Sequence, residues 1–569
     1  MKDNMIPEKP LLNGAQIAIR TLERLGVKTC FAYPGGSAVD FHQALADSGI
    51  QVVLPRHEQG GAFAANGYAR ATGQVGVCMA TSGPGATNLL TGIADAYMDS
   101  IPVVVITGQV ETWYIGKNAF QETDIIGMTR PIVKHSYLVL DPAEISSTIV
   151  NAFELARSGR PGPVWIDIPK NIQKMTLEFQ FEPAPALHKK PLHRHAASAE
   201  LEQIRHAIAK SQRPCIYAGG GIISGGASEE LTRFAETYNI PVATSLMGIG
   251  AFPETHPLSL KYLGMHGTYY ANYAADQCDL LLAFGARFAD RSTGNAKEFA
   301  RDAFIIHIDI DESEINKNVH ADIGIAADIR EVLHELNREP VFLPRQEWME
   351  MIRRWKTEHP LAYHPVPDKL KPQQVIETLY RLTDGKAVIV PGVGQHQMWA
   401  AQFYQYTRPR QLLTSGGLGT MGFGLPAAMG AKLALPEELI INIDGDGSFQ
   451  MNIQELGTIA VEEIAVKMII LNNQHLGMVA QIEDLFYRGK RGNTDLRTKE
   501  NKPFPHFVGI ANSYDIPARD VFSADELEDA IREMLETPGP FLLDCHTVYQ
   551  DHVLPMIPGG KSCKDMITE

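Results

Sequence analysis

The sequence has no long run of basic residues and no stretch of about 18 uninterrupted apolar residues, the length that a membrane-spanning helix needs. The formal net charge is −15, from 51 Lys and Arg against 66 Asp and Glu. The longest basic cluster, residues 188–195 (HKKPLHRH), is short and interrupted by proline, so we interpret it as a solvated linker. Because phosphate binding needs clustered cations, we expect neither nucleic acid nor a membrane as the main partner.

The six cysteines form no C-x-x-C pair, which disfavours a disulfide framework or a zinc site. The N-terminal stretch MKDNMIPEKPLLNG carries charges of both signs and has no apolar core, so it does not have the pattern of a signal peptide. Unpaired thiols are typical of a reducing compartment. Together these observations predict a cytoplasmic protein.

The chain has 569 residues, enough for about three or four domains. With 44% apolar and 21% charged residues, wholesale disorder is excluded. Two segments, 181–198 and 338–372, are rich in proline and indicate connectors. They divide the chain into predicted domains of residues 1–182, 196–338 and 368–569.

Short apolar runs alternate with amphipathic segments throughout, a rhythm that is typical of β-α-β units. We therefore predict an α/β protein of three doubly wound domains, each with a central, mainly parallel sheet. The expected strands are residues 51–55, 75–80, 102–107, 164–168, 214–217, 279–284, 304–310, 387–390, 438–443 and 467–471.

The most informative segment is residues 440–473. One expected strand leads into Gly445-Asp446-Gly447-Ser448, and the next strand leads into Asn472-Asn473. In an open α/β sheet the carboxyl ends of such strands lie at one edge, where ligands bind. A carboxylate and an amide oxygen are ligands suited to Mg²⁺ shared with phosphate oxygens, and the glycines allow a phosphate to come close to a helix N-terminus.

This spacing, Gly-Asp-Gly followed after residues 448–471 by Asn-Asn, resembles the thiamine-diphosphate motif. Further segments resemble the large, catalytic subunit of acetohydroxyacid synthase over nearly the whole chain. They are residues 55–59 (PRHEQ), 81–88 (TSGPGATN), 119–122 (AFQE), 158–163 (SGRPGP), 265–268 (MHGT), 394–399 (GQHQMW) and 414–428 (TSGGLGTMGFGLPAA).

The resemblance implies an acetolactate synthase that decarboxylates pyruvate and transfers the hydroxyethyl carbanion to a second pyruvate or to 2-ketobutyrate. The products would be 2-acetolactate or 2-aceto-2-hydroxybutyrate, in the first step of the biosynthesis of valine and isoleucine. The implied cofactors are thiamine diphosphate, Mg²⁺ and a structural FAD. The three predicted domains would then bind the thiamine pyrimidine, FAD and the diphosphate with Mg²⁺, in chain order.

Several residues take catalytic roles by the same resemblance. Glu58 matches the glutamate that hydrogen-bonds the aminopyrimidine ring and promotes loss of the thiazolium C2 proton, and Arg291 matches a residue that would hold the acceptor carboxylate. The other matched catalytic residues are Phe120, Gln121, Lys134 and Met478. The implied metal ligands are Asp446, Asn473 and the backbone carbonyl of His475.

The remaining matches are residues that contact the cofactors. Met421 matches the side chain that supports the bent thiamine, and His266, Arg287, Asp309 and Asp328 match FAD contacts. The others are Tyr33, Pro34, Pro84, Asn88, Arg160, Gly220, Gly221, Ser245, Leu246, Leu263, Met265, Gly285, Ile310, Val393, Gly394, Gln395, His396, Gly419, Gly445, Gly447, Ser448, Leu476 and Gly477.

The sequence departs from the family pattern at two positions. Ala289 replaces the first Asp of R-F-D-D-R, which removes one expected polar contact to FAD. Ile482 stands where the family commonly has a Trp that is associated with preference for 2-ketobutyrate and with sulfonylurea binding. An aliphatic side chain cannot reproduce that aromatic surface, so we expect little preference between the two acceptors.

Three alternatives remain open from the sequence. Residues 417–422 fit the dinucleotide pattern G-x-G-x-x-G, which on its own would indicate a dehydrogenase. Another thiamine-diphosphate enzyme of 2-keto acids, such as pyruvate oxidase, would share many of the motifs, and a non-catalytic paralogue would share the fold. The resemblance also implies a homo-oligomer with its active site at the subunit interface, and it leaves room for a separate regulatory small subunit.

Overall fold

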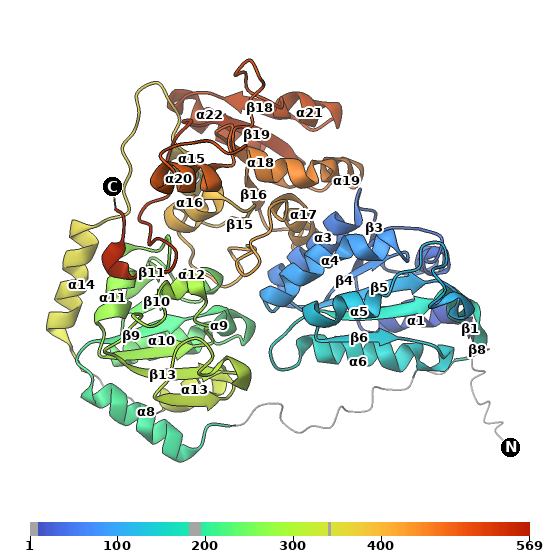
Figure 1. The fold of residues 1–569 in the computed structure, drawn as a ribbon, viewed down its shortest axis with the longest axis horizontal. Coiled ribbons are helices and arrows are strands. Elements are labelled where there is room, and N and C mark those ends of the chain that lie inside the picture. Colours follow the sequence, from blue (N-terminus) through green and yellow to red (C-terminus); the bar gives the residue numbers. More distant parts are fainter. Residues whose placement is uncertain (1–9, 180, 182–194, 339–342, 569) are drawn as a thin grey trace. The chain divides into compact units, whose positions relative to one another are not determined.

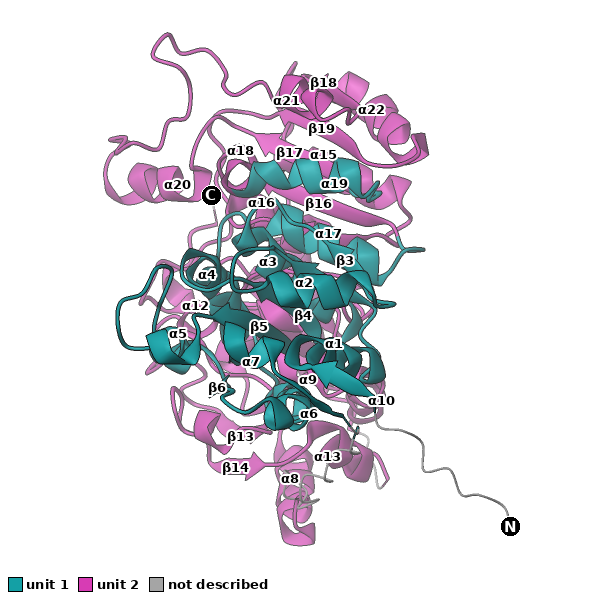
Figure 2. Cartoon of the chain, turned by 90° about the vertical axis from the view of Figure 1, so that its right-hand side faces the viewer, with its two compact units in different colours: residues 1–190, 417–438, 452–466 teal, residues 191–416, 439–451, 467–569 magenta. Residues whose placement is uncertain are grey.

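The computed structural model describes residues 10–179, 181, 195–338 and 343–568 (Figure 1). Most of the predicted basic linker, residues 188–194, and the start of the N-terminal stretch lie outside these described residues. The chain forms two compact units (Figure 2). Unit 1 comprises residues 1–190, 417–438 and 452–466, and unit 2 comprises residues 191–416, 439–451 and 467–569.

Unit 1 is built on a six-stranded parallel sheet of order β3-β2-β4-β5-β7-β6. Its central strand β5 (VVVITGQ) is buried along its whole length, as a strand covered on both faces must be. A short antiparallel pair, β1 (Leu11–Asn13) and β8 (Thr176–Glu178), lies outside the sheet. The sheet strands are β2 (Thr29–Ala32), β3 (Gln51–Val53), β4 (Gly76–Ala80), β5 (Val103–Gln109), β6 (His135–Leu138) and β7 (Val164–Pro169).

Helices on both sides of this sheet complete unit 1. Two of them, α17 and α19, come from late in the sequence. Helix α17 packs closely against α3. The helices are α1 (Gly14–Arg24), α2 (Val39–Ala46), α3 (Glu58–Thr72), α4 (Pro84–Met98), α5 (Ile125–Thr129), α6 (Ile145–Arg157), α7 (Lys170–Lys174), α17 (Gly424–Ala434) and α19 (Leu456–Val461).

The first sheet of unit 2 is also parallel and has the order β11-β10-β9-β12-β13-β14. Alternate residues of its strands enter two different cores: Ile216 and Leu282 pack toward α8, α10 and α13, whereas Tyr217 and Leu281 pack toward α11 and α14. The strands are β9 (Pro214–Ala218), β10 (Val242–Thr244), β11 (Ser259–Tyr262), β12 (Leu280–Phe284), β13 (Phe304–Asp309) and β14 (Ile323–Ala326).

One helix of this layer falls inside a predicted connector. Helix α14 contributes Trp348, Ile352 and Trp355 to the core, so part of segment 338–372 is packed structure. The helices are α8 (Ser198–Lys210), α9 (Gly220–Ser224), α10 (Ser228–Tyr238), α11 (Tyr269–Gln277), α12 (Asp290–Thr293), α13 (Ile329–Leu336) and α14 (Gln346–Glu358).

The second sheet of unit 2 has five parallel strands in the order β15-β16-β17-β19-β18. The strands are β15 (Val388–Pro391), β16 (Ile440–Gly445), β17 (Lys467–Asn472), β18 (Ala518–Val521) and β19 (Phe541–His546). The helices are α15 (Pro372–Leu382), α16 (Gln395–Phe403), α18 (Asp446–Phe449), α20 (Gly477–Phe486), α21 (Phe507–Ser513) and α22 (Ala524–Glu536).

The predicted fold class is confirmed, with three parallel sheets in the described residues, and each of the ten expected strands corresponds to an observed one. All six cysteines are buried free thiols. Among the described residues, no helix is both long and apolar enough to cross a membrane.

Candidate functional site

The sequence-predicted metal ligands of unit 2 lie at one edge of the β15-β16-β17 sheet. Asp446 follows β16 and begins α18, Asn473 follows β17, and Val393 and Gly394 follow β15. Since these three strands are parallel neighbours, their carboxyl ends lie side by side. The structure therefore brings together Asp446, Asn473 and the Gly394–Gln395 turn.

Asp446 is a buried carboxyl group with an unused oxygen. Its side chain is 1% exposed, and Oδ2 has no hydrogen-bond partner among the described residues. Burial raises its pKa to about 8, and the nearby charge of Asp544 acts in the same direction. A buried carboxylate that lacks a partner is costly unless a cation compensates it, so this site fits a bound Mg²⁺.

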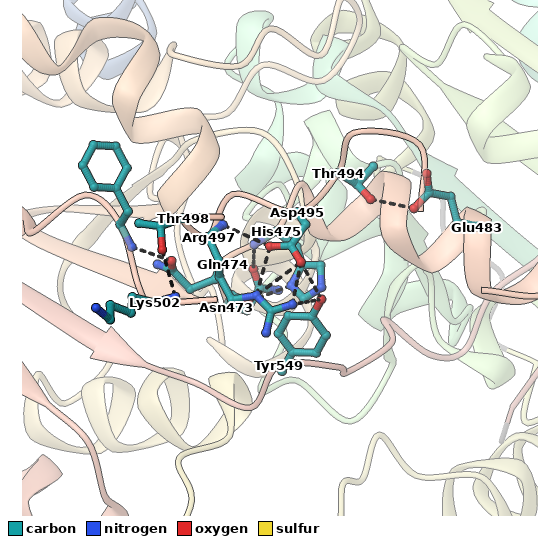
Figure 3. Close-up of polar contacts among 11 residues, drawn as sticks. Asn473, Gln474, His475, Glu483, Thr494, Asp495, Arg497, Thr498, Lys502 and Tyr549 are labelled. Carbon is teal, nitrogen blue, oxygen red and sulfur yellow. Dashed lines mark hydrogen bonds and ion pairs between the residues drawn. The ribbon is translucent and has the colours of Figure 1, made fainter. Parts of the chain in front are cut away.

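The loop after β17 is held in an unusual conformation. Gln474 has a positive φ of 60°, and its side-chain oxygen accepts a 2.7 Å hydrogen bond from the backbone N–H of Phe504. Asn473 Oδ1 accepts the backbone N–H of His475 at 3.2 Å, while the His475 Nδ1 lies 2.7 Å from the Asn473 carbonyl oxygen. Figure 3 shows these residues beside the segment that contains Thr494 and Asp495.

Tyr549 contacts both His475 and the neighbouring Asp495. The Tyr549 ring lies 3.6 Å from the His475 ring, centroid to centroid, and the Tyr549 hydroxyl donates to Asp495 at 3.2 Å (Figure 3). Arg497 donates to the same carboxylate and holds the pKa of Asp495 well below its usual range. His475 Nε2 is buried without a partner among the described residues, and the residue lines a small pocket together with Asn473 and Gln395.

Two glycines, Gly445 and Gly477, allow the side chains of His396 and Gln395 to lie close to the backbone. A Cβ at Gly445 would lie 2.6 Å from His396 Nδ1, and one at Gly477 would lie 2.1 Å from Gln395 Oε1. Any larger residue at either position would displace those side chains. Ser448, Leu476 and Met478 follow directly on the same loops and helix starts, with Met478 half-buried on α20.

In unit 1 the structure brings Glu58 together with the loop after β4. Glu58 begins α3, and its Oε2 accepts a 3.0 Å hydrogen bond from Asn88 Nδ2. A Cβ at Gly85 would lie 3.3 Å from Glu58 Oε1, and one at Gly83 would lie 2.7 Å from the carbonyl oxygen of Gln121. Glu58 and Gln121 thus lie next to the start of α4, and Glu58 is hydrogen-bonded to Asn88 on that helix.

The loop that carries Phe120 and Gln121 is stabilised by hydrogen bonds within the loop. The Glu122 carboxylate accepts backbone N–H groups of Gly116, Lys117 and Ala119. Gln121 has a positive φ of 59°, and the Phe120 side chain is 88% exposed. The loop therefore holds its shape while presenting an aromatic ring to its surroundings.

Lys134 and Arg160 have partners in unit 1. The Lys134 ammonium donates to the carbonyl oxygens of Leu155 and Ser158, at the end of α6. Arg160 Nε donates to Ser100 Oγ at 2.8 Å. Tyr33 and Pro34 follow directly after β2, at the carboxyl ends of the strands, whereas Lys134 and Arg160 precede β6 and β7.

A buried ion network holds the segment with Gly419 and Met421. Arg70 pairs with Asp95 at 3.0 Å and with Asp99 at 2.8 Å. Asp99 also accepts the backbone N–H of Gly417 at 2.7 Å, and Asp95 accepts the Thr420 hydroxyl at 3.0 Å. These contacts hold Gly417 and Thr420, the first and fourth residues of the G-x-G-x-x-G pattern 417–422.

The context of this pattern does not match a dinucleotide fingerprint. In the fingerprint the glycines follow a strand directly, but here α16 lies between β15 and residues 417–422. The dehydrogenase interpretation is therefore not supported.

The residues matched to FAD gather at the first sheet of unit 2. Its strand order places a topological switch point between β9 and β12, where doubly wound sheets bind dinucleotides. Gly220 and Gly221 follow β9, and Gly285 and Arg287 follow β12; Gly221 N donates to the Gly285 carbonyl at 3.0 Å. Other matched residues follow neighbouring strands of the sheet: Ser245, Leu246, Leu263, Met265, Asp309, Ile310 and Asp328.

His266 gives a separate observation on that site. Its side chain is 5% exposed, and Nδ1 has no partner among the described residues. Burial lowers its pKa to about 4, so the ring is neutral and Nδ1 is free to exchange a hydrogen bond with a ligand. Arg291 lies on α12, where its guanidinium is 69% exposed and pairs with Asp290 at 2.6 Å.

Sequence reasoning missed the groups that support the site, including Glu455, Arg70, Asp95 and Asp99. Glu455 accepts the backbone N–H groups of the two residues before Glu58. The sequence signal for such residues is a charged side chain at a position that should be buried, and it becomes visible only once the packing is known.

Comparison with known proteins gives three family matches. Residues 12–128, 201–336 and 392–545 match the N-terminal TPP binding domain, the central domain and the C-terminal TPP binding domain of thiamine pyrophosphate enzymes. Together they cover most of the chain.

Individual relatives match over nearly all of this chain. The chain is 52% identical to acetolactate synthase 1, chloroplastic, of Nicotiana tabacum, covering 99% of this chain and 86% of the relative. It is 51% identical to acetolactate synthase, chloroplastic, of Arabidopsis thaliana, with coverages of 99% and 85%. Acetolactate synthase 1, chloroplastic, of Zea mays is 51% identical, with coverages of 98% and 89%.

These relatives correct the predicted location. The sequence led us to expect a cytoplasmic protein, and this is wrong, since the relatives are named chloroplastic. Buried thiols are typical of any reducing compartment, so they could not distinguish the cytoplasm from another one.

Proposed function

The chain belongs to the acetolactate synthases, a family of thiamine-diphosphate-dependent enzymes, and from that membership we infer that it converts pyruvate to 2-acetolactate. The full-length identity of about half to acetolactate synthases carries this inference. The alternative of a pyruvate oxidase is not supported by these relatives. With 2-ketobutyrate as acceptor the product would be 2-aceto-2-hydroxybutyrate, which places the reaction at the start of branched-chain amino-acid biosynthesis.

Thiamine diphosphate, when bound, supplies a thiazolium carbon that accepts the electrons released by decarboxylation. Glu58 is suited to hold and return a proton at the pyrimidine ring, because its half-buried carboxylate is already oriented by Asn88. Gln121 and Phe120 would also border the pyrimidine site, from the loop that the Glu122 carboxylate holds in place. Met421, next to Thr420, whose hydroxyl donates to Asp95, would support the cofactor.

We assign Mg²⁺ to Asp446, Asn473 and the backbone carbonyl of His475. The unpartnered Oδ2 of Asp446 and its raised pKa support this assignment, since a divalent cation would compensate the buried charge. Diphosphate oxygens would complete the coordination, and backbone N–H groups at the start of α18 (Asp446–Phe449) would be available to them.

We assign FAD to the switch point between β9 and β12. The strand order and the unpartnered Nδ1 of His266 support it, while Ala289 removes one contact of the family pattern. Protein incubated with FAD and then freed of excess should absorb at about 450 nm. The absence of flavin absorbance after this treatment would overturn the assignment.

We assign Arg291 to binding of the acceptor carboxylate, and we assign Lys134 and Phe120 to contacts with the acceptor as well. The pair of Arg291 with Asp290 is exposed, and an anionic substrate can replace such a weak contact. The exposed apolar side chains of unit 1, Trp113, Phe120 and Met128, support a homo-oligomer in which a second subunit completes the site. A regulatory small subunit is a further possible partner.

The domain limits 1–182, 196–338 and 368–569 remain our assignment for the pyrimidine-binding, FAD-binding and diphosphate-binding parts. The matched segments 12–128, 201–336 and 392–545 support it, since each falls within one of the three ranges.

The test is product formation by protein freed of its cofactors. Acetolactate should form from pyruvate only when thiamine diphosphate and Mg²⁺ are both added, and without oxygen uptake. Pyruvate consumption coupled to peroxide formation would indicate an oxidase instead, and no consumption under any condition would reject an enzyme of this class.

A further inference from the structure

The N-terminus of α3 is closed by a carboxylate from a distant part of the sequence. Glu455 accepts the backbone N–H of Arg56 at 3.1 Å through both oxygens and the backbone N–H of His57 at 3.1 Å. Its side chain is completely buried. Arg56 and His57 are the two residues directly before Glu58, the first residue of α3.

The surrounding contacts fasten the same turn. Thr458 Oγ1 donates to Glu455 Oε2 at 2.8 Å and lies 3.2 Å from the Leu54 carbonyl oxygen. The Arg56 guanidinium donates to the carbonyl oxygens of Leu54 and Gly457. Strand end, turn and helix start are thereby tied to residues 455–458, which belong to the same compact unit.

The Glu455 carboxyl group lies at the N-terminus of α3, where the helix dipole favours negative charge. A helix of 15 residues carries a partial positive charge at its N-terminus, where its first N–H groups lack partners within the helix. Burial raises the pKa of Glu455, whereas the Arg56 N–H, the Thr458 hydroxyl and the His57 N–H oppose that change. Both oxygens of the Glu455 carboxyl group therefore accept hydrogen bonds.

Gly60 shows how closely the two segments approach. A Cβ at this position would lie 2.3 Å from Glu455 Oε1, so only glycine leaves room for the carboxylate. Two residues before Gly60, Glu58 Oε2 accepts a hydrogen bond from the side-chain amide of Asn88. The direction of the Glu58 side chain thus depends on where the turn 55–57 places the first residue of α3.

We propose that Glu455 is a positioning residue for Glu58: its buried carboxylate fixes the turn before α3 and thereby aims the Glu58 carboxylate. The proposal rests on the proposed function, in which Glu58 exchanges a proton at the cofactor. A purely structural carboxylate would affect folding alone, whereas a positioning residue affects turnover in the folded protein.

The test compares Glu455→Gln with Glu254→Gln. Glu254 is a buried carboxylate of unit 2 that accepts the backbone N–H of Tyr406 at 3.0 Å, so it is a matched control outside the catalytic machinery. In cofactor-free protein, amide hydrogen exchange of residues 56–58 should accelerate in Glu455→Gln and stay unchanged in Glu254→Gln. With cofactors, kcat of Glu455→Gln should fall about tenfold with little change in the KM for pyruvate.

Each outcome decides the matter. Unchanged exchange at residues 56–58, or a kcat that falls only as the folded fraction does and equally in Glu254→Gln, overturns the proposal. If Glu455→Gln does not fold, Thr458→Val removes one hydrogen bond to the same carboxylate and should lower kcat about threefold. Should wild-type protein make no acetolactate, the proposed function fails, while the exchange experiment still tests whether Glu455 holds the turn.

Discussion

The side-chain amide of Asn88 donates a 3.0 Å hydrogen bond to the Glu58 carboxylate. Both residues belong to unit 1, Glu58 at the start of α3 and Asn88 on the second turn of α4. The resemblance had placed Asn88 among the residues that contact the cofactor. In the structure it orients the proposed proton carrier, which gives it a role that can be measured.

Replacement of Asn88 by Ala should lower kcat about tenfold, since a hydrogen bond to a charged group contributes about 1.5–3 kcal/mol. Steady-state kinetics with saturating cofactors measures this. Thr87→Ala, one position earlier on the same helix, is the control and should leave kcat unchanged. A wild-type kcat in Asn88→Ala would show that the contact does not serve catalysis.

Two inactive variants should complement each other. Glu58→Gln and Asp446→Asn each remove one half of the proposed site, and a dimer of mixed subunits would contain one site with both groups intact. If the active site lies between subunits, co-expression should restore about a quarter of the wild-type activity. Co-expression of Asp446→Asn with Asn473→Ala, which damage the same half, should restore none. Equal inactivity of both mixtures would argue that each site lies within one chain.

Glu254 should make the protein less stable as pH rises. Burial raises its pKa from 4.5 to about 7, against the opposing effects of Lys261 and the Tyr406 N–H. Between these values the folded state keeps a proton that the unfolded state has lost, so the free energy of unfolding falls as pH increases. The loss across the interval is about 3 kcal/mol.

Glu254→Gln removes this titration while keeping an acceptor for Tyr406. Relative to wild type, the variant should therefore gain stability between about pH 5 and about pH 8. Urea unfolding at the two pH values measures the difference. A difference between variant and wild type that does not change with pH would mean that Glu254 titrates normally.

Ile482 should make the enzyme nearly indifferent to the choice of acceptor. It lies on α20 with 39% of its surface exposed, where the family commonly has Trp. Ile482→Trp should raise the ratio of acetohydroxybutyrate to acetolactate about tenfold in a competition assay, because an aromatic surface adds contact to the extra methylene. Phe486→Trp, on the same helix, is the control. A wild-type protein that already strongly prefers 2-ketobutyrate would contradict this account.

The sequence was sufficient to predict the sheet edge with Asp446 and Asn473. Both residues follow buried aliphatic strands, and parallel strands leave few ways to arrange such ends. The flavin residues were likewise placed by the strands that precede them, since Gly220 and Gly285 mark the ends of β9 and β12.

Packing between distant helices was beyond the sequence. Helix α17 clusters with unit 1, although the strands on either side of it belong to unit 2. The reason is close contact between small residues: a Cβ at Gly67 would lie 2.1 Å from the Ala427 carbonyl oxygen, and one at Gly430 would lie 1.9 Å from that of Ala64. Small residues are common in helices, so their pattern does not identify a partner. Glu455 was missed because its contacts with Arg56 and His57 join segments that lie far apart in the sequence.

The central claim, that Glu58 exchanges a proton during acetolactate synthesis, is tested most directly by the rate of Glu58→Gln. With thiamine diphosphate, Mg²⁺ and pyruvate at saturation, the account predicts a rate of acetolactate formation at least about 100-fold below wild type, with an unchanged melting temperature. A Glu58→Gln protein that forms acetolactate at the wild-type rate would contradict it.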